Sequence, residues 1–392
     1  MDIYEKSLEL HKSNRGKLEI VGKVPCETPE DLCLAYTPGV ANPCKEIVNN
    51  EENSFVYTNR GNTVAVITDG SAVLGLGNIG ASASLPVMEG KCLLFKKFAD
   101  IDAFPICLKT QDTKEIISIC KNLEPGLGGI NLEDISAPRC VEIEETLKKE
   151  MNIPVFHDDQ HGTAIVVLAA LINATRLMNK NPEEYKVVIS GTGAAGSSII
   201  KTLYNYGFKD ILAFDIDGCL NKDDSENYNS LKKELLKYVN LNNEKYTSLK
   251  EGLVGRDVFI GVSAANLLDV EAVKSMSSKP IIFALANPNP EISYDDAKAA
   301  NAYIIGTGRS DYPNQINNIL AFPGIFRGAL DAHATKITDK EKIVASEAIA
   351  YLISDEELNP DYVIPSPFDE RVVKAVSQAV KQSCINNGFV RK

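Results

Sequence analysis

Residues 185–196 have the sequence YKVVISGTGAAG, and this stretch decides the fold of the chain. The apolar run that ends at Ser190 is typical of a buried strand. A glycine pattern of the form GxGxxG follows at once, and the apolar segment 197–206 after it predicts a helix. A strand, a glycine turn and a helix in this order indicate a dinucleotide-binding unit of the Rossmann type.

The spacing of the motif points to NAD as the dinucleotide. Its six residues are Gly191, Thr192, Gly193, Ala194, Ala195 and Gly196. Gly193 would let a pyrophosphate approach the N-terminus of the helix. The next predicted strand, 211–214, ends at Asp215, where a carboxylate would accept hydrogen bonds from the adenosine ribose. Because Asp217 adds a second carboxylate and no Lys or Arg follows before Lys222, a 2′-phosphate would be repelled. We therefore expect NAD to be preferred, with NADP bound more weakly.

Two further apolar runs, 258–263 and 281–286, predict buried strands of the same sheet. Both end in small or polar residues that would border the cofactor, including Val262 and Ser263. Asn287 opens the rigid turn that follows the second run, and this turn carries amides without charge.

Two pairs of acidic residues precede the Rossmann unit. Asp158 and Asp159 lie in the stretch FHDDQHGT, between a predicted strand at 153–156 and a helix expected at 164–178 with Thr163 as its N-cap. Their position at the carboxyl end of a strand is where ligands bind in a parallel sheet.

The second pair, Glu133 and Asp134, ends the apolar run 129–132, and a helix is expected between the pairs at 138–151. A strand, helix and strand of this length form a parallel crossover, which puts both pairs on one edge of a sheet. Four carboxylates together would raise each other's pKa, and hard oxygen ligands favour Mg²⁺ or Mn²⁺. The alternative is that both pairs are solvated loop ends or helix caps.

The region before these pairs predicts a parallel sheet of its own. Strands are expected at 63–67 and 102–108, with helices at 81–98 and 113–123. A second GxGxxG pattern occurs at 75–80, but its strand lies several residues upstream and no acidic strand end follows it. We interpret these glycines as a close backbone approach beside a site.

Two single residues are candidates for proton chemistry. Lys91 is followed by Leu93, Leu94 and Phe95, so its ammonium group would be partly desolvated and its pKa lowered toward the range of a base. The alternative is a lysine that extends to solvent. Tyr36 precedes a Pro-Gly turn that would hold its hydroxyl on a loop of fixed shape, although a tyrosine at a turn is more often a packing residue.

The chain is therefore predicted to be an α/β protein with two parallel-sheet domains and a helical C-terminal segment. Residues 1–160 would form a substrate and metal domain, 161–328 the Rossmann domain, and 329–392 a helical segment packed on the rest.

Composition excludes several classes of function. A formal net charge of −12 over 392 residues argues against a nucleic-acid surface. The N-terminus lacks the pattern of a signal peptide, and the longest apolar run, 164–172, is too short to span a bilayer. Nine scattered cysteines without a CxxC pair are expected to be free thiols in a reducing cytoplasm.

Taken together, the sequence resembles the malic enzymes of the short prokaryotic type over nearly its whole length. The motifs that carry the resemblance are AYTPGVA (35–41), VLGLGNIG (73–80), PVMEGK (86–91), NLEDI (131–135), FHDDQHGT (156–163) and NNILAFPG (317–324). The resemblance implies oxidative decarboxylation of L-malate to pyruvate and CO₂ with NAD and a divalent cation. It also implies a homodimer, with both chains lining each active site.

The resemblance assigns a role to each candidate. Lys91 would be the general base for the malate hydroxyl, Asp158 would pair with Lys91, and Tyr36 would protonate C3 of enolpyruvate. Glu133, Asp134 and Asp159 would hold the cation. Asn287 and Asn318 would bind the substrate and the nicotinamide end.

One departure from the family pattern concerns the grip on the substrate carboxylate. The larger eukaryotic members carry an arginine in the turn after Thr68-Asp69-Gly70, whereas this chain has Ser71-Ala72. Anchoring would then fall to the cation, the asparagines and backbone amides. Two other readings remain open at this stage: a metal-dependent 2-hydroxy-acid dehydrogenase that releases no CO₂, and an NAD-binding regulatory protein without catalysis.

Overall fold

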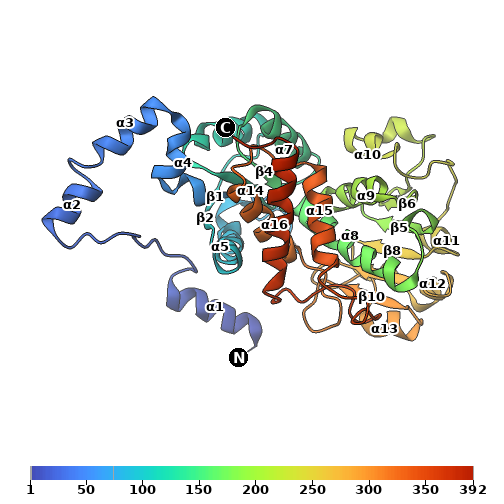
Figure 1. Cartoon of the computed structure of the whole chain (residues 1–392). Coiled ribbons are helices and arrows are strands. Elements are labelled where there is room, and N and C mark those ends of the chain that lie inside the picture. Colours follow the sequence, from blue (N-terminus) through green and yellow to red (C-terminus); the bar gives the residue numbers. More distant parts are fainter. Residues whose placement is uncertain (1, 74, 392) are drawn as a thin grey trace.

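The computed structural model describes residues 2–73 and 75–391 and has two α/β lobes bridged by C-terminal helices (Figure 1). The N-terminal lobe contains β1 (Thr63–Thr68), α5 (Gly80–Ala99), β2 (Asp102–Cys107), α6 (Thr113–Leu123), η3 (Glu124–Gly126), β3 (Gly129–Leu132), α7 (Arg139–Glu150) and β4 (Val155–His157). Its four strands are all parallel, in the order β2-β1-β3-β4. Leu132 is paired with His157, so the two acidic pairs follow neighbouring strand ends, as the sequence predicts.

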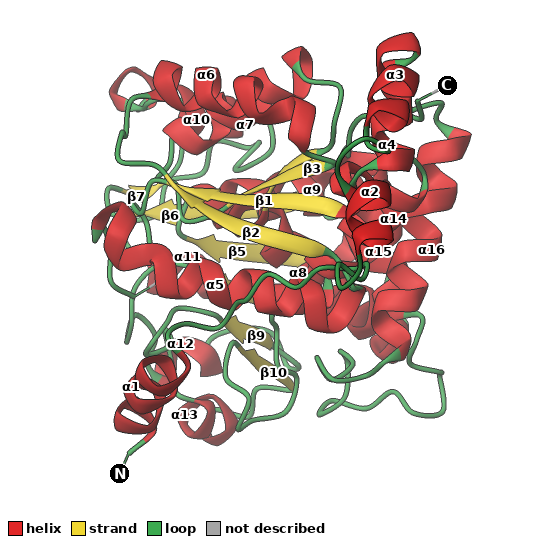
Figure 2. Ribbon diagram, turned by 90° about the vertical axis from the view of Figure 1, so that its left-hand side faces the viewer, coloured by secondary structure: helices red, strands yellow, loops and turns green. Residues whose placement is uncertain are grey.

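Helices cover both faces of this sheet, which is why β1 is buried throughout. In Figure 2, α6 and α7 lie on one face, where their apolar residues pack against Ala65 and Ile67. Helix α5 lies on the other face and packs with Val64 and Val66.

The second lobe is a Rossmann-type sheet in the order β10-β9-β8-β5-β6-β7, parallel except for β7. Its elements are η4 (Pro182–Glu184), β5 (Lys186–Ser190), α9 (Ala194–Tyr206), β6 (Asp210–Asp215), β7 (Gly218–Cys219), η5 (Ser225–Asn227), α10 (Ser230–Leu235), α11 (Leu249–Leu253), β8 (Val258–Gly261), α12 (Val270–Lys274), β9 (Ile281–Ala284), α13 (Tyr294–Ala299) and β10 (Ile304–Thr307). The strand order reverses at β5: the chain first adds β6 on one side of β5 and later adds β8 on the other side. Ligands bind outside strand ends at such a point.

A single long helix, α8 (Asp158–Met178), joins the two lobes. It is apolar and long enough to cross a bilayer, but most of its apolar window is buried within the protein, as in a core helix. One continuous core runs from β1 through α8 to β5. The closing elements η6 (Asn318–Leu320), α14 (Phe322–Asp331), α15 (Asp339–Ala350) and α16 (Arg371–Asn386) pack around it.

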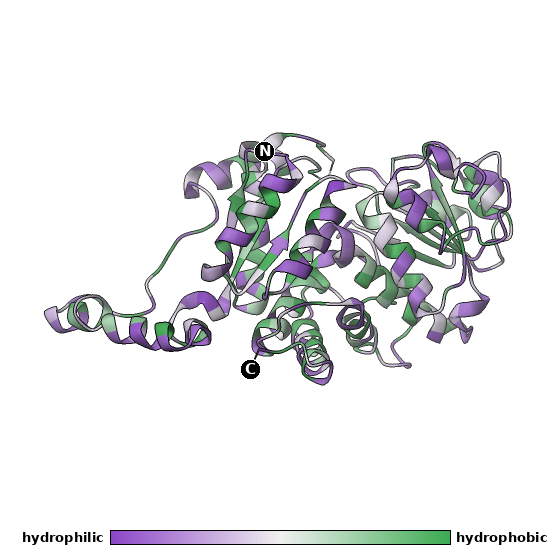
Figure 3. Ribbon diagram, turned by 90° about the horizontal axis from the view of Figure 1, so that it is seen from above, coloured by the Kyte–Doolittle hydropathy of each residue, from purple (hydrophilic) through white to green (hydrophobic). Residues whose placement is uncertain are grey.

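The N-terminal segment projects from the body as an arm (Figures 1 and 3). It comprises α1 (Ile3–Asn14), α2 (Pro29–Ala35) and α3 (Ala41–Asn49), and η1 (Glu51–Asn53), α4 (Ser54–Tyr57) and η2 (Asn59–Asn62) connect it to β1. None of residues 2–50 is buried. Large apolar side chains on it are solvent-exposed, among them Tyr4, Ile20 and Leu34.

Most predicted elements are confirmed, and the main error concerns α8. The expected N-cap at Thr163 is wrong, because the helix begins directly after β4 at Asp158, with His157 as its N-cap. The two aspartates therefore lie in the first helical turn, where the helix dipole favours negative charge. The elements β7, β10 and α10 to α13 were not predicted, since each is short and has no strong periodicity. All nine cysteines are free, as expected.

The predicted domain boundaries fall within helices. Residue 160 lies in the first turn of α8, and residue 328 lies inside α14. Residues of α8 belong to one hydrophobic core that includes strands of both lobes. The division of the chain at residues 160 and 328 therefore stays a prediction.

Candidate active site

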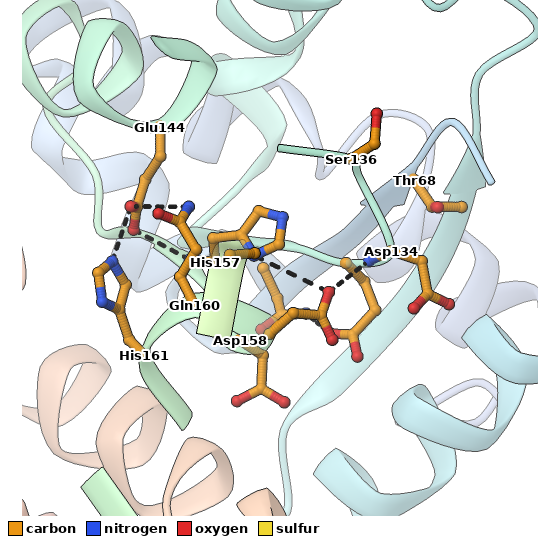
Figure 4. A network of polar contacts seen from close by, with 12 residues as sticks. Thr68, Asp134, Ser136, Glu144, His157, Asp158, Gln160 and His161 are labelled. Atoms are coloured by element: carbon orange, nitrogen blue, oxygen red, sulfur yellow. Dashed lines mark hydrogen bonds and ion pairs between the residues drawn. The ribbon is translucent and has the colours of Figure 1, made fainter. Parts of the chain in front are cut away.

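A cluster of carboxylates forms where the ends of β3 and β4 meet. Oxygen atoms of Glu133, Asp134 and Asp159 all lie within 4.8 Å of one another. The backbone N–H of Asp134 donates to Asp159 Oδ2 at 2.7 Å, which joins the two strand ends (Figure 4). Asp134 takes a left-handed conformation with φ of 53°, so the chain turns sharply at the cluster.

Burial and mutual repulsion raise the pKa values of these carboxylates, because the cluster contains more negative than positive charge. Burial, followed by the charges of Asp159 and Glu133, raises the pKa of Asp134 to about 9. Burial likewise raises the pKa of Asp158 and of Asp159 to about 6 and raises that of Glu133. The Oδ2 atom of Asp134 is buried without a hydrogen-bond partner. Three hard oxygen donors with an unpartnered atom fit a divalent cation such as Mg²⁺ or Mn²⁺.

Lys91 reaches this cluster from α5. Its Nζ lies 2.6 Å from Asp158 Oδ2 and 2.8 Å from Glu133 Oε1, and 4.2 Å from the centre of the Phe322 ring. The expectation of a lowered lysine pKa is wrong for this arrangement. Burial alone would lower the pKa of Lys91, but the charges of Asp158 and Glu133 outweigh it and raise the pKa above its ordinary value.

Asn318 completes the group around Asp158. Its Nδ2 donates to Asp158 Oδ2, the same oxygen that contacts Lys91. This packing requires a glycine at position 162, because a Cβ there would lie 2.1 Å from Asp158 Oδ1 and 2.9 Å from Asn318 Cβ. The structure thus brings Lys91, Asp158 and Asn318 together beside the predicted cation ligands.

The glycine loop after β5 has the features that a dinucleotide needs. A Cβ at Gly191 would lie 2.7 Å from Val262 O, and one at Gly196 would lie 1.9 Å from Gly191 O, so both positions require glycine. Gly193 is exposed with nothing within 4 Å of a Cβ, which leaves its approach open. No side chain caps α9, so its first N–H groups are free to bind a pyrophosphate.

Asp215 is the last residue of β6, at the position expected for the ribose, and it contacts two side chains that the sequence did not indicate. Thr192 Oγ1 donates to Asp215 Oδ2, and Lys232 Nζ from α10 lies 2.9 Å from the same oxygen and 3.3 Å from Asp217. Burial would raise the pKa of Asp215, but the hydrogen bonds from Thr192 and Lys232 lower it, so the carboxylate is ionised. The sequence has no Lys or Arg between Asp217 and Lys222, but α10 folds back and brings Lys232 to both aspartates, which the expected repulsion of a 2′-phosphate did not take into account.

The remaining cofactor candidates line the same edge of the sheet. Ser263 Oγ lies 2.9 Å from Ser190 Oγ, next to Val262. Glu291, which was not predicted, is fully buried and accepts from the N–H groups of Ser263 and Ala286. A Cβ at Gly75 would lie 3.5 Å from Asn287 O. That is an ordinary contact distance, and a Cβ at Gly77 or Gly80 would meet nothing within 4 Å, so the predicted close backbone approach is not observed at these glycines. All three have positive φ, and this backbone conformation is what favours glycine there.

Two features differ from the sequence expectations: the position of Tyr36 and the group that contacts the turn at Ser71. Tyr36 is 67% exposed at the end of α2 on the projecting arm and is not brought to Lys91 (Figure 1). The turn that lacks the family arginine is held instead by Arg139 of α7, whose Nη2 lies 2.9 Å from Asp69 Oδ2 and 3.0 Å from Ser71 Oγ. No sequence motif marked Arg139, because its contact depends on how α7 packs.

A dinucleotide-type glycine loop in one lobe, together with a buried lysine and a carboxylate cluster that fits a cation in the other, is typical of one class of protein, the metal-dependent nicotinamide dehydrogenases. Residues 15–148 match the family model "Malic enzyme, N-terminal domain", and residues 160–386 match "Malic enzyme, NAD binding domain". The chain belongs to the malic enzyme family.

Individual relatives agree over the full length. The chain is 56% identical to the "Bifunctional malic/malolactic enzyme" of Bacillus subtilis, over 100% of this chain and 95% of that protein. It is 52% identical to the "NAD-dependent malic enzyme" of Geobacillus stearothermophilus, over 96% and 78% respectively. The crystal structure of the NAD-dependent malic enzyme from Thermotoga maritima aligns with a TM-score of 0.92 at 51% identity, over 97% of this chain and 99% of that chain.

We predict that Gly162→Ala lowers turnover by about 10²-fold, because the added methyl group displaces Asp158 and a shift of this size misplaces Lys91. Steady-state kinetics and a thermal melt would measure the effect. The control is Gly126→Ala, since a Cβ at Gly126 meets nothing within 4 Å. Equal turnover in the two variants would contradict the proposed tight packing.

Proposed function

We propose that this protein catalyses the oxidative decarboxylation of L-malate to pyruvate and CO₂, with NAD as the preferred oxidant and Mg²⁺ or Mn²⁺ as cofactor. The observation that carries the proposal is the position of Lys91 between Asp158 and Glu133, beside three carboxylates whose oxygen atoms lie close enough to share one cation. The cytoplasm is the proposed location, supported by nine free cysteines.

Lys91 is proposed as the general base that takes the proton of the C2 hydroxyl. Asp158 and Asn318 hold the lysine in place through one shared oxygen. Bound NAD would accept the hydride that leaves C2. A cation held by Glu133, Asp134 and Asp159 would offset the negative charge that raises the pKa of Lys91 and would stabilise negative charge on the C2 oxygen.

The carboxylate at C4 then leaves as CO₂ when the C3–C4 bond breaks, and C3 needs a proton to give pyruvate. We assign this proton to the hydroxyl of Tyr36 and infer that it comes from the partner in a homodimer. The exposed apolar arm supports this, because surfaces of this kind mark protein interfaces. Asn287 and Asn318 are proposed to orient the substrate and the nicotinamide.

A second product is also considered because of the Bacillus subtilis relative, whose name includes a malolactic activity. Conversion of malate to lactate and CO₂ involves no net change of NAD. Lactate is therefore to be measured beside pyruvate.

We predict that Lys91→Ala lowers kcat by ~10²–10⁴-fold, the range for loss of a general base, while NAD still binds. The assay follows NADH, CO₂ and pyruvate from malate, with NAD or NADP and with Mg²⁺ or Mn²⁺. Chelation of the metal should abolish the wild-type activity, and added Mn²⁺ should restore it.

Lys97→Ala is the matched control, since Lys97 is exposed on the same helix. Near-normal turnover of Lys91→Ala would remove Lys91 as the base. Oxaloacetate as the final product of the wild type, without CO₂, would support a simple dehydrogenase. A wild type that forms no NADH and releases no CO₂ would support a regulatory protein.

We predict that two inactive variants, Tyr36→Phe and Lys91→Ala, regain activity as a hybrid dimer. Two sites form in a symmetric pair, and one of them would hold both intact residues, so about half of the wild-type turnover per dimer is expected. Co-expression with two different tags isolates the hybrid for kinetics.

The matching control pairs Lys91→Ala with Asp158→Asn. These two residues contact each other within one chain, so their hybrid should stay inactive. An inactive hybrid of Tyr36→Phe with Lys91→Ala would show that Tyr36 does not act across the interface.

We predict that Asp215→Ser raises the preference for NADP over NAD by roughly tenfold to a hundredfold. The change removes the repelling carboxylate and frees Lys232, already in place, for a charge-assisted hydrogen bond to a 2′-phosphate. The ratio of kcat/KM for the two cofactors measures it. Adding Lys232→Met to Asp215→Ser should cancel the gain, and an unchanged ratio in the single variant would place discrimination elsewhere.

A further inference from the structure

A second buried polar network lies behind the carboxylate cluster and has no part in the chemistry described so far. Its centre is Glu144 of α7, which is 2% exposed. Glu144 Oε1 accepts from the backbone N–H of His157 at 3.0 Å, and Oε2 accepts from His161 Nε2 at 2.7 Å and from Gln160 Nε2 at 3.4 Å (Figure 4). One carboxylate therefore holds three positions of the β4–α8 junction.

The contacts around this network fix the direction of its hydrogen bonds. Because Glu144 needs a donor at 2.7 Å, the ring proton lies on Nε2, and Nδ1 accepts from Ser198 Oγ at 2.9 Å. Lys148 Nζ lies 2.6 Å from Glu144 Oε1. Glu144 is thus an ionised acceptor whose charge is balanced by a neighbouring lysine.

The residues that Glu144 holds flank the two aspartates of the site. His157 immediately precedes Asp158 and Asp159, and His161 follows them in the same helical turn. On the opposite side, Asp159 Oδ2 is fixed by the N–H of Asp134. The first turn of α8 is therefore anchored from two directions, by β3 in front and by α7 behind.

We propose that Glu144 is a positioning residue for the cation site, which holds the first turn of α8 so that Asp159 and Asp158 keep their places beside Glu133 and Lys91. This inference rests on the proposed function, which assigns Asp159 as a cation ligand. Groups that orient metal ligands from behind commonly change metal affinity by about 10–100-fold when removed.

A cavity beside Glu144 should allow the positioning role to be tested without loss of the fold. A cavity of about 390 Å³ lies between the helices of both lobes and α15, and it is bordered by Glu144, His161 and Lys342. Its polar lining is suited to water, which would replace the hydrogen bonds of a truncated side chain. Loss of the Glu144 carboxylate should therefore loosen the turn without unfolding the protein.

The test compares Glu144→Ala and Glu144→Gln with the wild type by titration of Mn²⁺ followed by electron paramagnetic resonance. We expect the dissociation constant for Mn²⁺ to rise about 10–100-fold in Glu144→Ala. A smaller rise is expected in Glu144→Gln, because its amide oxygen still accepts from His157. The dissociation constant for NAD should stay within about twofold, since none of the hydrogen bonds and ion pairs described for Glu144 involves residues 191–196.

The control variant is Glu145→Gln, an exposed residue next along α7 that borders the same cavity. Mn²⁺ affinity in Glu144→Ala equal to that of Glu145→Gln would overturn the inference, even if the melting temperature falls. If Glu144→Ala does not fold, the same comparison is made with Glu144→Gln. A wild type that binds no Mn²⁺ would instead overturn the ligand assignment in the proposed function.

Discussion

The arrangement of this protein depends on keeping Lys91 charged between two buried carboxylates. An isolated ammonium group in an apolar interior is strongly disfavoured, and so is an isolated carboxylate. The Lys91 ammonium, within 2.8 Å of both Asp158 and Glu133, partly satisfies each of the three groups. Because the lysine comes from α5 and the carboxylates follow β3 and β4, this contact exists only when the N-terminal sheet is correctly formed.

The same contact ties the N-terminal lobe to the Rossmann lobe. Asp158 is the first residue of α8, the helix whose body forms the core shared by both sheets. Asn318, which bonds to Asp158, leads into α14, whose Phe322 ring lies against Lys91. An apolar helix with a charged first turn thus connects the residues proposed for proton transfer to the core of the Rossmann lobe.

The electrostatics of the cluster favour the proposed cation. One lysine does not balance four carboxylates, so burial and repulsion keep the pKa of Asp134 near 9 and those of Asp158 and Asp159 near 6. A bound dication would relieve the repulsion between these carboxylates. In the Rossmann lobe, burial alone would raise the pKa of Asp215, but hydrogen bonds from Thr192 and Lys232 lower it, so the carboxylate is ionised at the position proposed for the ribose.

The sequence by itself determined the α/β class, the Rossmann unit, the two acidic pairs at neighbouring strand ends and the resemblance to malic enzymes. These depend on local spacing: a strand followed by GTGAAG, or a carboxylate pair after an apolar run, has the same meaning wherever the chain folds. Only the tertiary structure decided the raised pKa of Lys91, the lysine beside Asp215, the exposed position of Tyr36 and the bonds of Glu144. Each is set by groups far apart in the chain, and a pKa or a contact depends on distances that packing alone fixes.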